Sequence, residues 1–114
     1  MQEADVIRMR HMLAAAREAV EFVHGRTRDD LNDDRQLVLA LVKAIEIIGE
    51  AANQVSQSAR DETLEIPWDD IIGMRHLLVH TYFDIDLDIL WKTPQADLPS
   101  LIAELERVTP RDSH

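Results

Sequence analysis

The sequence predicts an all-α protein, a bundle of four or five helices. Along most of its 114 residues, apolar side chains recur in steps of three and four, which is the period of an amphipathic helix. No stretch of useful length alternates apolar and polar residues as a half-buried strand does. Only three glycines and four prolines interrupt the chain, and no linker, repeat or low-complexity tract divides it. We therefore expect one helical domain over residues 1–114.

The first predicted helix runs for about five turns and ends near Gly25, since glycine favours helix ends. Its apolar stripe consists of Val6, Met9, Leu13, Ala16, Val20 and Val23. A second stripe on this helix carries Arg10, Arg17 and His24, seven residues apart. That stripe is either a solvated face or a track for the phosphates of a nucleic acid.

The second predicted helix is apolar over more than one face. Its main apolar stripe consists of Leu37, Leu41, Ala44, Ile48, Ala51 and Val55. Val38, Ile45 and Ala52 widen this stripe, and Leu39, Val42 and Ile47 lie outside it. Such a helix is usually buried on two sides. Its second side is covered either by another subunit or, in a monomer, by the rest of the bundle.

Gly49 stands inside this helical pattern, where glycine costs about 1 kcal/mol relative to alanine. Close packing of a neighbouring helix would explain it. Glu50 either lies in the same region and pairs with an arginine, or is exposed.

The third predicted helix opens at Ile66-Pro67-Trp68, since proline suits a first helical turn, and its apolar residues continue to about Tyr82. A short helix follows, capped by Asp84 or Asp86, and it extends through Trp91 until Pro94 terminates it. The last helix carries Leu98, Leu101, Ile102, Leu105 and Val108.

Charge and composition narrow the function. The net charge is −10, and residues 29–70 alone carry eleven acidic and three basic side chains, a net of −8. This charge argues against binding of nucleic acid by bulk attraction, so any such function needs a local site. The acidic middle consists either of solvated helix ends or of a docking face for a basic partner. The chain has no cysteine, no apolar run near 20 residues and no signal peptide, so we expect a cytoplasmic protein without disulfides, thiolate sites or a membrane span.

The densest group of reactive side chains lies between Arg75 and Tyr82. On an ideal helix His80 would lie about 140° around the axis from Arg75. Joint use of the two therefore requires the helix to end or distort near His80, or a second subunit to complete the cleft. These residues could also be ordinary amphipathic side chains at a bundle edge. The pair His76 and His80, at i and i+4, could ligate zinc, but a third ligand and a His-Glu-x-x-His pattern are missing.

The same residues suit metal-independent cleavage of RNA. That reaction needs a base for the 2′-hydroxyl, an acid for the leaving 5′-oxygen and a cation for the phosphorane charge. Histidine suits the first two tasks near neutral pH, and arginine, whose planar fork grips phosphate oxygens, suits the third. Two copies of His80 across a dimer axis could divide the acid and base roles.

Arg75-x4-His80-x-Tyr82 resembles the Arg-x4-His-x-Tyr motif of HepT-type toxins, which belong to the HEPN superfamily. The likeness extends to Gly49-Glu50-Ala51, Ile66-Pro67-Trp68, and Tyr82-Phe83-Asp84 followed by Trp91. His76 stands where most such chains carry asparagine. The resemblance implies a dimeric HEPN bundle acting as a ribonuclease without cofactor or metal. In it Arg75 binds the scissile phosphate, His80 is the general acid and base, and His76 assists.

The resemblance also implies a partner, a nucleotidyltransferase antitoxin of the MntA type, in a type VII toxin–antitoxin system. That antitoxin neutralises the toxin by transferring AMP to the motif tyrosine, here Tyr82. The added phosphate would compete for Arg75. On the first predicted helix, Arg10 and Arg17 of the basic stripe are the candidate RNA contacts. The alternative is a catalytically inactive, nucleotide-binding helical partner of a nucleotidyltransferase, and a third interpretation is a regulatory dimer with a degenerate site.

Overall fold

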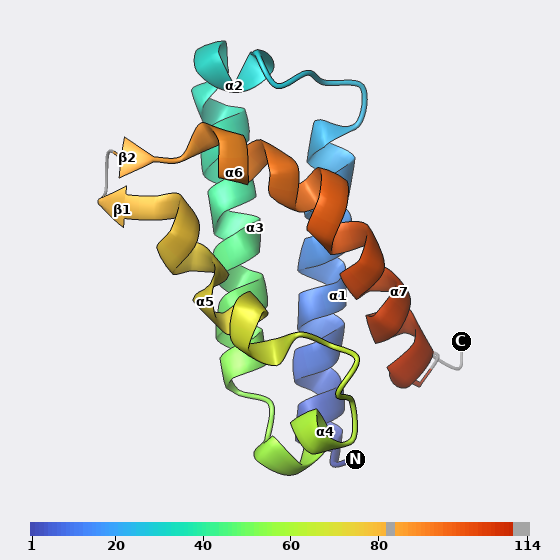
Figure 1. The fold of residues 1–114 in the computed structure, drawn as a ribbon. Helices are drawn as coiled ribbons and strands as arrows, with labels where there is room; N and C mark the ends of the chain where they lie inside the picture. Colours follow the sequence, from blue (N-terminus) through green and yellow to red (C-terminus); the bar gives the residue numbers. More distant parts are fainter. Residues whose placement is uncertain (82–83, 111–114) are drawn as a thin grey trace.

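The computed structural model describes residues 1–81 and 84–110 of the chain; the side chains of Arg75 and of residues 77–81 are also outside the described part. The two long helices α1 (Glu3–Val23) and α3 (Arg35–Asn53) lie antiparallel at its centre (Figure 1). Helix α5 (Trp68–Leu78) packs on α3, and α7 (Leu98–Val108) packs on α1. The expected all-α bundle is therefore confirmed, while its dimeric state remains a prediction.

The remaining elements are short. Helix α2 (Asp30–Asp33) and helix α4 (Gln57–Asp61) lie at the two ends of α3 (Figure 1). Strands β1 (Val79–Thr81) and β2 (Asp84–Ile85) form an antiparallel hairpin after α5. Helix α6 (Leu87–Lys92) leads through the π-helical turn η1 (Thr93–Asp97) into α7.

Small and large apolar side chains alternate in the α1–α3 contact. Met9, Met12 and Ala16 of α1 are fully buried there, as are Leu41 and Ile48 of α3. Alanines allow the two helix axes to approach, so the predicted stripes become one continuous core. At the end of α1 the chain turns at Gly25, whose φ of 74° lies in the left-handed region that glycine adopts without strain. The predicted end of this helix is confirmed.

The acidic cluster at residues 29–34 has a structural use. The Asp34 carboxylate caps α3 by accepting from the backbone N–H of Leu37 at 3.0 Å, and it pairs with Arg26. Asp30 accepts from the Thr27 backbone N–H at 2.8 Å and also pairs with Arg26. These hydrogen bonds, the backbone ones first, hold the pKa of both carboxyls below the usual value. Part of the acidic middle therefore serves helix ends.

One predicted boundary and the predicted role of Pro94 are wrong, whereas α6 ends at Lys92, one residue after the predicted Trp91. Helix α5 ends at Leu78 instead of near Tyr82, because the chain pairs β1 with β2. Pro94 does not terminate the helical path after α6. It lies in η1, where the Leu98 N–H bonds to the Thr93 carbonyl five residues back, and Pro99, in the first turn of α7, has no N–H for its own helical bond.

Of the two candidate caps for the short helix, Asp86 is the one used. Its carboxylate accepts from the backbone N–H groups of Asp88 and Ile89, both at 3.1 Å. No helix in the described ranges has the length and apolar content needed to traverse a lipid bilayer.

Candidate functional site

The motif helix α5 is fixed at its start by Trp68. The indole is only 7% exposed, and its Nε1–H donates to the backbone carbonyl and the hydroxyl of Thr63, each at 3.2 Å. The Thr63 hydroxyl in turn donates to the carbonyl of Ala59 at 2.8 Å. Trp68 therefore ties the first residue of α5 to the end of α4.

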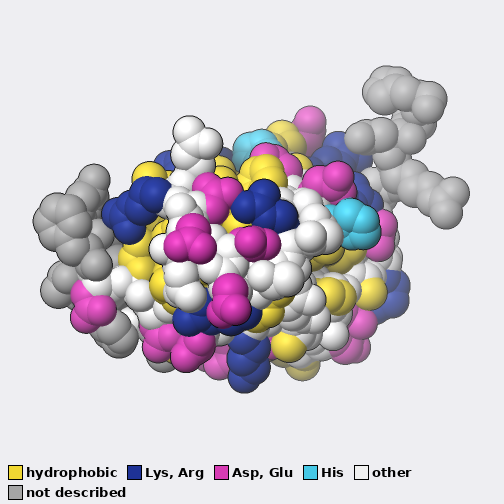
Figure 2. Space-filling model, turned by 90° about the horizontal axis from the view of Figure 1, so that it is seen from above, with side chains coloured by type: hydrophobic (Ala, Val, Ile, Leu, Met, Phe, Trp, Pro, Cys, Tyr) yellow, Lys and Arg dark blue, Asp and Glu magenta, His cyan; other side chains and the backbone are white. Residues whose placement is uncertain are grey.

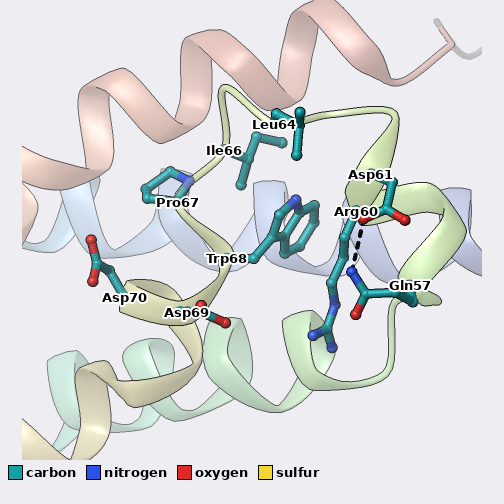
Figure 3. A pocket seen from close by; sticks show the side chains of 9 residues that line it. All are labelled: Gln57, Arg60, Asp61, Leu64, Ile66, Pro67, Trp68, Asp69 and Asp70. Carbon is teal, nitrogen blue, oxygen red and sulfur yellow. Dashed lines mark hydrogen bonds between the residues drawn. The ribbon is translucent and has the colours of Figure 1, made fainter.

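Arg60 adds a second connection at this point. Its guanidinium lies 6.0 Å from the centre of the Trp68 ring (Figure 3). It also donates to the carbonyls of Ala52, Asn53 and Val55, at 3.1 to 3.2 Å, which satisfies acceptors left open at the end of α3. The sequence analysis missed this residue, because α4 is too short to show a period. Its only signal in the sequence is a lone arginine shortly after a long helix.

The contact between α3 and α5 is close at Gly49. A β-carbon added to Gly49 would lie 3.5 Å from the carbonyl oxygen of Ile71 and 3.8 Å from that of Ile72. The expectation that a neighbouring helix packs closely here is confirmed. Both distances are ordinary van der Waals contacts, so the space does not by itself exclude alanine. Glu50 is exposed.

The end of α5 decides how the motif is laid out. Arg75 and His76 lie in the last four residues of the helix, and the His76 side chain is exposed. His80 lies beyond the helix, in β1. The condition for using Arg75 and His80 together, that the helix ends before His80, is therefore met by the backbone. Tyr82, the predicted AMP acceptor, lies outside the described residues.

The zinc interpretation loses its geometric basis. It assumed that His76 and His80 share one helix face, but the helix ends at Leu78 and His80 is in a strand. Among the side chains that the structure describes, which do not include that of His80, no three His, Asp or Glu residues cluster in a way that could hold a metal ion.

Arg10 and Arg17 lie on the α7 side of the bundle. Arg17 forms an ion pair with Glu106 at 2.6 Å, and Arg10 donates to the carbonyl of Pro110 at 3.1 Å. The hairpin projects from the α3 side (Figure 1). One protomer therefore does not bring these arginines to the motif.

The end of the bundle seen in Figure 2 carries both signs of charge. Acidic and basic side chains are interspersed over it, and its described residues form no continuous basic surface. This agrees with the net charge of −10. Any hold on a phosphate backbone at this end must come from a few local groups.

The second face of α3 is partly uncovered in the protomer. Leu39 is 48% and Ile47 37% exposed. Beside Ile47, a shallow hollow of about 160 Å³ separates α1 from α3, lined by Phe22 and Ala40 among others. Leu39 and Ile47 lie eight residues apart on α3 with the exposed Lys43 between them, so two separate aliphatic side chains face solvent on this side of the helix.

Fold and motif together define the class of protein: an all-α bundle of the HEPN type, with an Arg-x4-His-x-Tyr sequence whose arginine lies in the last turn of a helix and whose histidine lies in the strand that follows. A family model described as Ribonuclease HepT-like matches residues 12–108. The chain belongs to the HepT-like ribonuclease family. The expected enzyme class, an endoribonuclease, is that of the family.

Individual relatives agree with this assignment. "Probable ribonuclease HepT" of Thermococcus cleftensis is 37% identical over 95 residues, covering 80% of this chain and 86% of the relative. "Putative RNase MJ1380" of Methanocaldococcus jannaschii is 32% identical over 97 residues, covering 85% and 89%. A relative named as an RNase in Caldanaerobacter subterraneus is 31% identical over 104 residues, covering 91% and 93%. No solved structure matches the chain significantly.

Proposed function

We propose that this protein is a metal-independent endoribonuclease toxin whose active site forms where two copies meet. Arg75 holds the scissile phosphate and His80 transfers protons. The observation that carries the proposal is the end of α5 at Leu78, which separates the two residues into a helix and a strand within a chain that belongs to a ribonuclease family. His76, exposed beside Arg75, assists in positioning the substrate.

The reaction is a transesterification. One His80, neutral, takes the proton of the 2′-hydroxyl, and the 2′-oxygen attacks phosphorus. The bond from phosphorus to the 5′-oxygen breaks, and the partner's His80, protonated, gives its proton to that oxygen. Arg75 stabilises the charge on the non-bridging oxygens. The products are a 2′,3′-cyclic phosphate and a 5′-hydroxyl, so the two histidines end in exchanged protonation states.

The test is RNA cleavage in EDTA by protein purified without its antitoxin. We expect cuts that end in 2′,3′-cyclic phosphates, which Arg75→Ala and His80→Ala abolish. Matched controls are Arg35→Ala and His11→Ala, which remove the same side-chain types from exposed positions on α3 and α1. Persistent cleavage by pure His80→Ala protein would refute the mechanism. Nucleotide binding without any cleavage would favour the inactive binding partner.

The dimer contact is assigned to the uncovered face of α3. Ile47→Glu places a charge in that face, and we expect it to convert dimers to monomers in sedimentation experiments and to remove cleavage. Leu64→Glu changes an exposed leucine outside that face and should leave the dimer intact. If Ile47→Glu remains dimeric, another surface forms the interface.

Regulation is proposed to occur at Tyr82, through AMP transferred from ATP by a nucleotidyltransferase antitoxin. Adenylylation attaches a phosphate to a residue seven positions after Arg75 in the sequence. That phosphate competes with RNA for Arg75 and so blocks entry of the substrate. The intact mass after co-expression with such an enzyme should rise by whole AMP units, and Tyr82→Phe should abolish the rise. An unchanged mass of the unaltered protein would remove this part of the proposal.

A further inference from the structure

Two hollows meet on the side of the bundle formed by the start of α5. The first, of about 400 Å³, lies over Trp68 and reaches from Gln57 to Asp70 (Figure 3). The second, of about 480 Å³, lies between α5, α6, η1 and α7. Pro67 and Asp70 line both hollows, so the two form one continuous surface, here called the Pro67 surface.

The second hollow has apolar walls. Ile71 and Met74 of α5 form one side, and Ile89 and Leu101 contribute from α6 and α7. Its volume lies within the range of about 300–1,000 Å³ that ligand sites occupy. Leu64, 78% exposed, lies in the loop that borders the first hollow. The Pro67 surface therefore offers apolar area that nothing in the described chain covers.

Its charges are strongly one-sided. Six carboxylates line the two hollows against two basic side chains, Arg60 and Lys92. Arg60 is already engaged with the carbonyls at the end of α3. The acidic side chains are Asp61, Glu65, Asp69, Asp70, Asp97 and Glu104.

Some of these carboxylates are already compensated within the chain. Arg107 pairs with Glu104 at 2.9 Å and with Glu65 at 3.4 Å. None of the basic side chains that the structure describes pairs with Asp69, Asp70 or Asp97. In Figure 3 the carboxylates of Asp61 and Asp70 lie at opposite ends of the first hollow, with the Trp68 indole between them.

We infer that the Pro67 surface docks a basic segment of a partner protein: an aliphatic or aromatic side chain enters the hollow between α5 and α7, and flanking lysines or arginines meet Asp69, Asp70 and Asp97. Charge complementarity selects this occupant. An acidic or neutral apolar segment would leave these carboxylates without counter-charges, and a purely basic one would leave the apolar walls exposed. The residues that line this surface include neither Arg75 and His80 nor the exposed Leu39 and Ile47 of α3. The inference therefore does not rest on the proposed function.

The probe is a short peptide of lysine and leucine, titrated into the full chain by calorimetry, with the Met74 methyl signal followed by NMR. We expect salt-sensitive binding that shifts the Met74 signal. A lysine–serine peptide of equal charge and a glutamate–leucine peptide of equal apolarity should bind at least tenfold more weakly, by about 1.4 kcal/mol or more.

Two variants locate the site. Asp69→Asn with Asp70→Asn should weaken the lysine–leucine peptide about tenfold, because two exposed ion pairs with the peptide are lost. Ala96→Phe fills the second hollow from the exposed turn η1 and should abolish the Met74 shift without removing charge. The matched control, Asp29→Asn with Asp33→Asn, removes the same charge from exposed positions near α2 and should leave affinity unchanged.

Three results would overturn the inference: equal weakening by the control pair, which would indicate bulk attraction; equal binding of the lysine–serine peptide, which would indicate no apolar anchor; or unchanged affinity in Ala96→Phe. RNA cleavage by Asp69→Asn with Asp70→Asn should stay at the level of the unaltered protein. Loss of peptide binding with cleavage retained therefore separates this surface from the proposed active site.

Discussion

An alanine at Gly73 should stabilise the protein, and the size of the effect follows from the structure. Gly73 lies inside α5, and a β-carbon added there would meet no atom within 4 Å. The substitution neither removes a contact nor creates a clash, so the helix propensity difference of about 1 kcal/mol remains. For 114 residues the unfolding entropy is about 240 cal/mol/K, and the expected rise in Tm is therefore about 4 °C.

Gly49→Ala provides a close comparison on the helix that faces α5. The added β-carbon makes ordinary contact with the Ile71 carbonyl, so we expect a rise of similar size. The reverse control is Ala103→Gly, at an exposed position of α7, which should lower Tm by about 4 °C.

The assay is thermal unfolding followed by circular dichroism, with all variants at one protomer concentration because association stabilises oligomers. If Gly73→Ala lowers Tm while Gly49→Ala raises it, the space beside Gly73 is filled in solution, and the reasoning from the isolated protomer fails at that position. A lower Tm for both variants would refute the use of helix propensity in this bundle.

Two further effects can be measured. Trp68→Ala removes the side chain that ties α5 to Thr63 and should lower the free energy of unfolding by about 3–5 kcal/mol in urea titrations; the half-buried Trp91→Ala should cost less, and equal losses would contradict the anchoring role. The Asp5 carboxylate accepts from the backbone N–H and then the hydroxyl of Ser56, at 2.8 and 2.7 Å, and both bonds lower its pKa. Its stabilising effect is therefore full above about pH 4, where the unfolded carboxyl ionises, and is lost as pH falls through the lower folded pKa. Asp5→Asn should lower Tm at pH 7, and the difference from the unaltered protein should shrink towards pH 3; a constant difference would show that charge plays no part.

Periodicity predicted the long helices because each one buries apolar side chains that recur in steps of three and four over many turns. The stripes of α1 and α3 correspond to the observed core, including Met9, Leu41 and Ile48. The same reasoning failed where few residues decide the outcome. Helices α2 and α4 have four and five residues, which is too short for a period to be recognised, and they depend on local caps such as Ser56.

The end of α5 could not be predicted from local sequence. Leu77, Leu78 and Val79 form an apolar run that suits a helix or a strand equally, and the pairing of β1 with β2 selects the strand. The arginine stripe of α1 has a different limit. The spacing correctly placed Arg10 and Arg17 on one side of α1. Glu106, the ion-pair partner of Arg17, is however 89 residues away in sequence, and periodicity contains no information about such contacts.

The motif helix connects the two surfaces proposed here. Trp68 holds its first residue, Gly49 of α3 contacts its middle, and Met74 lines the apolar hollow directly before Arg75. Met74, which lines the apolar hollow, and Arg75 of the motif are neighbouring residues of this 11-residue helix. A basic segment docked at the Pro67 surface would therefore contact the same helix that carries Arg75.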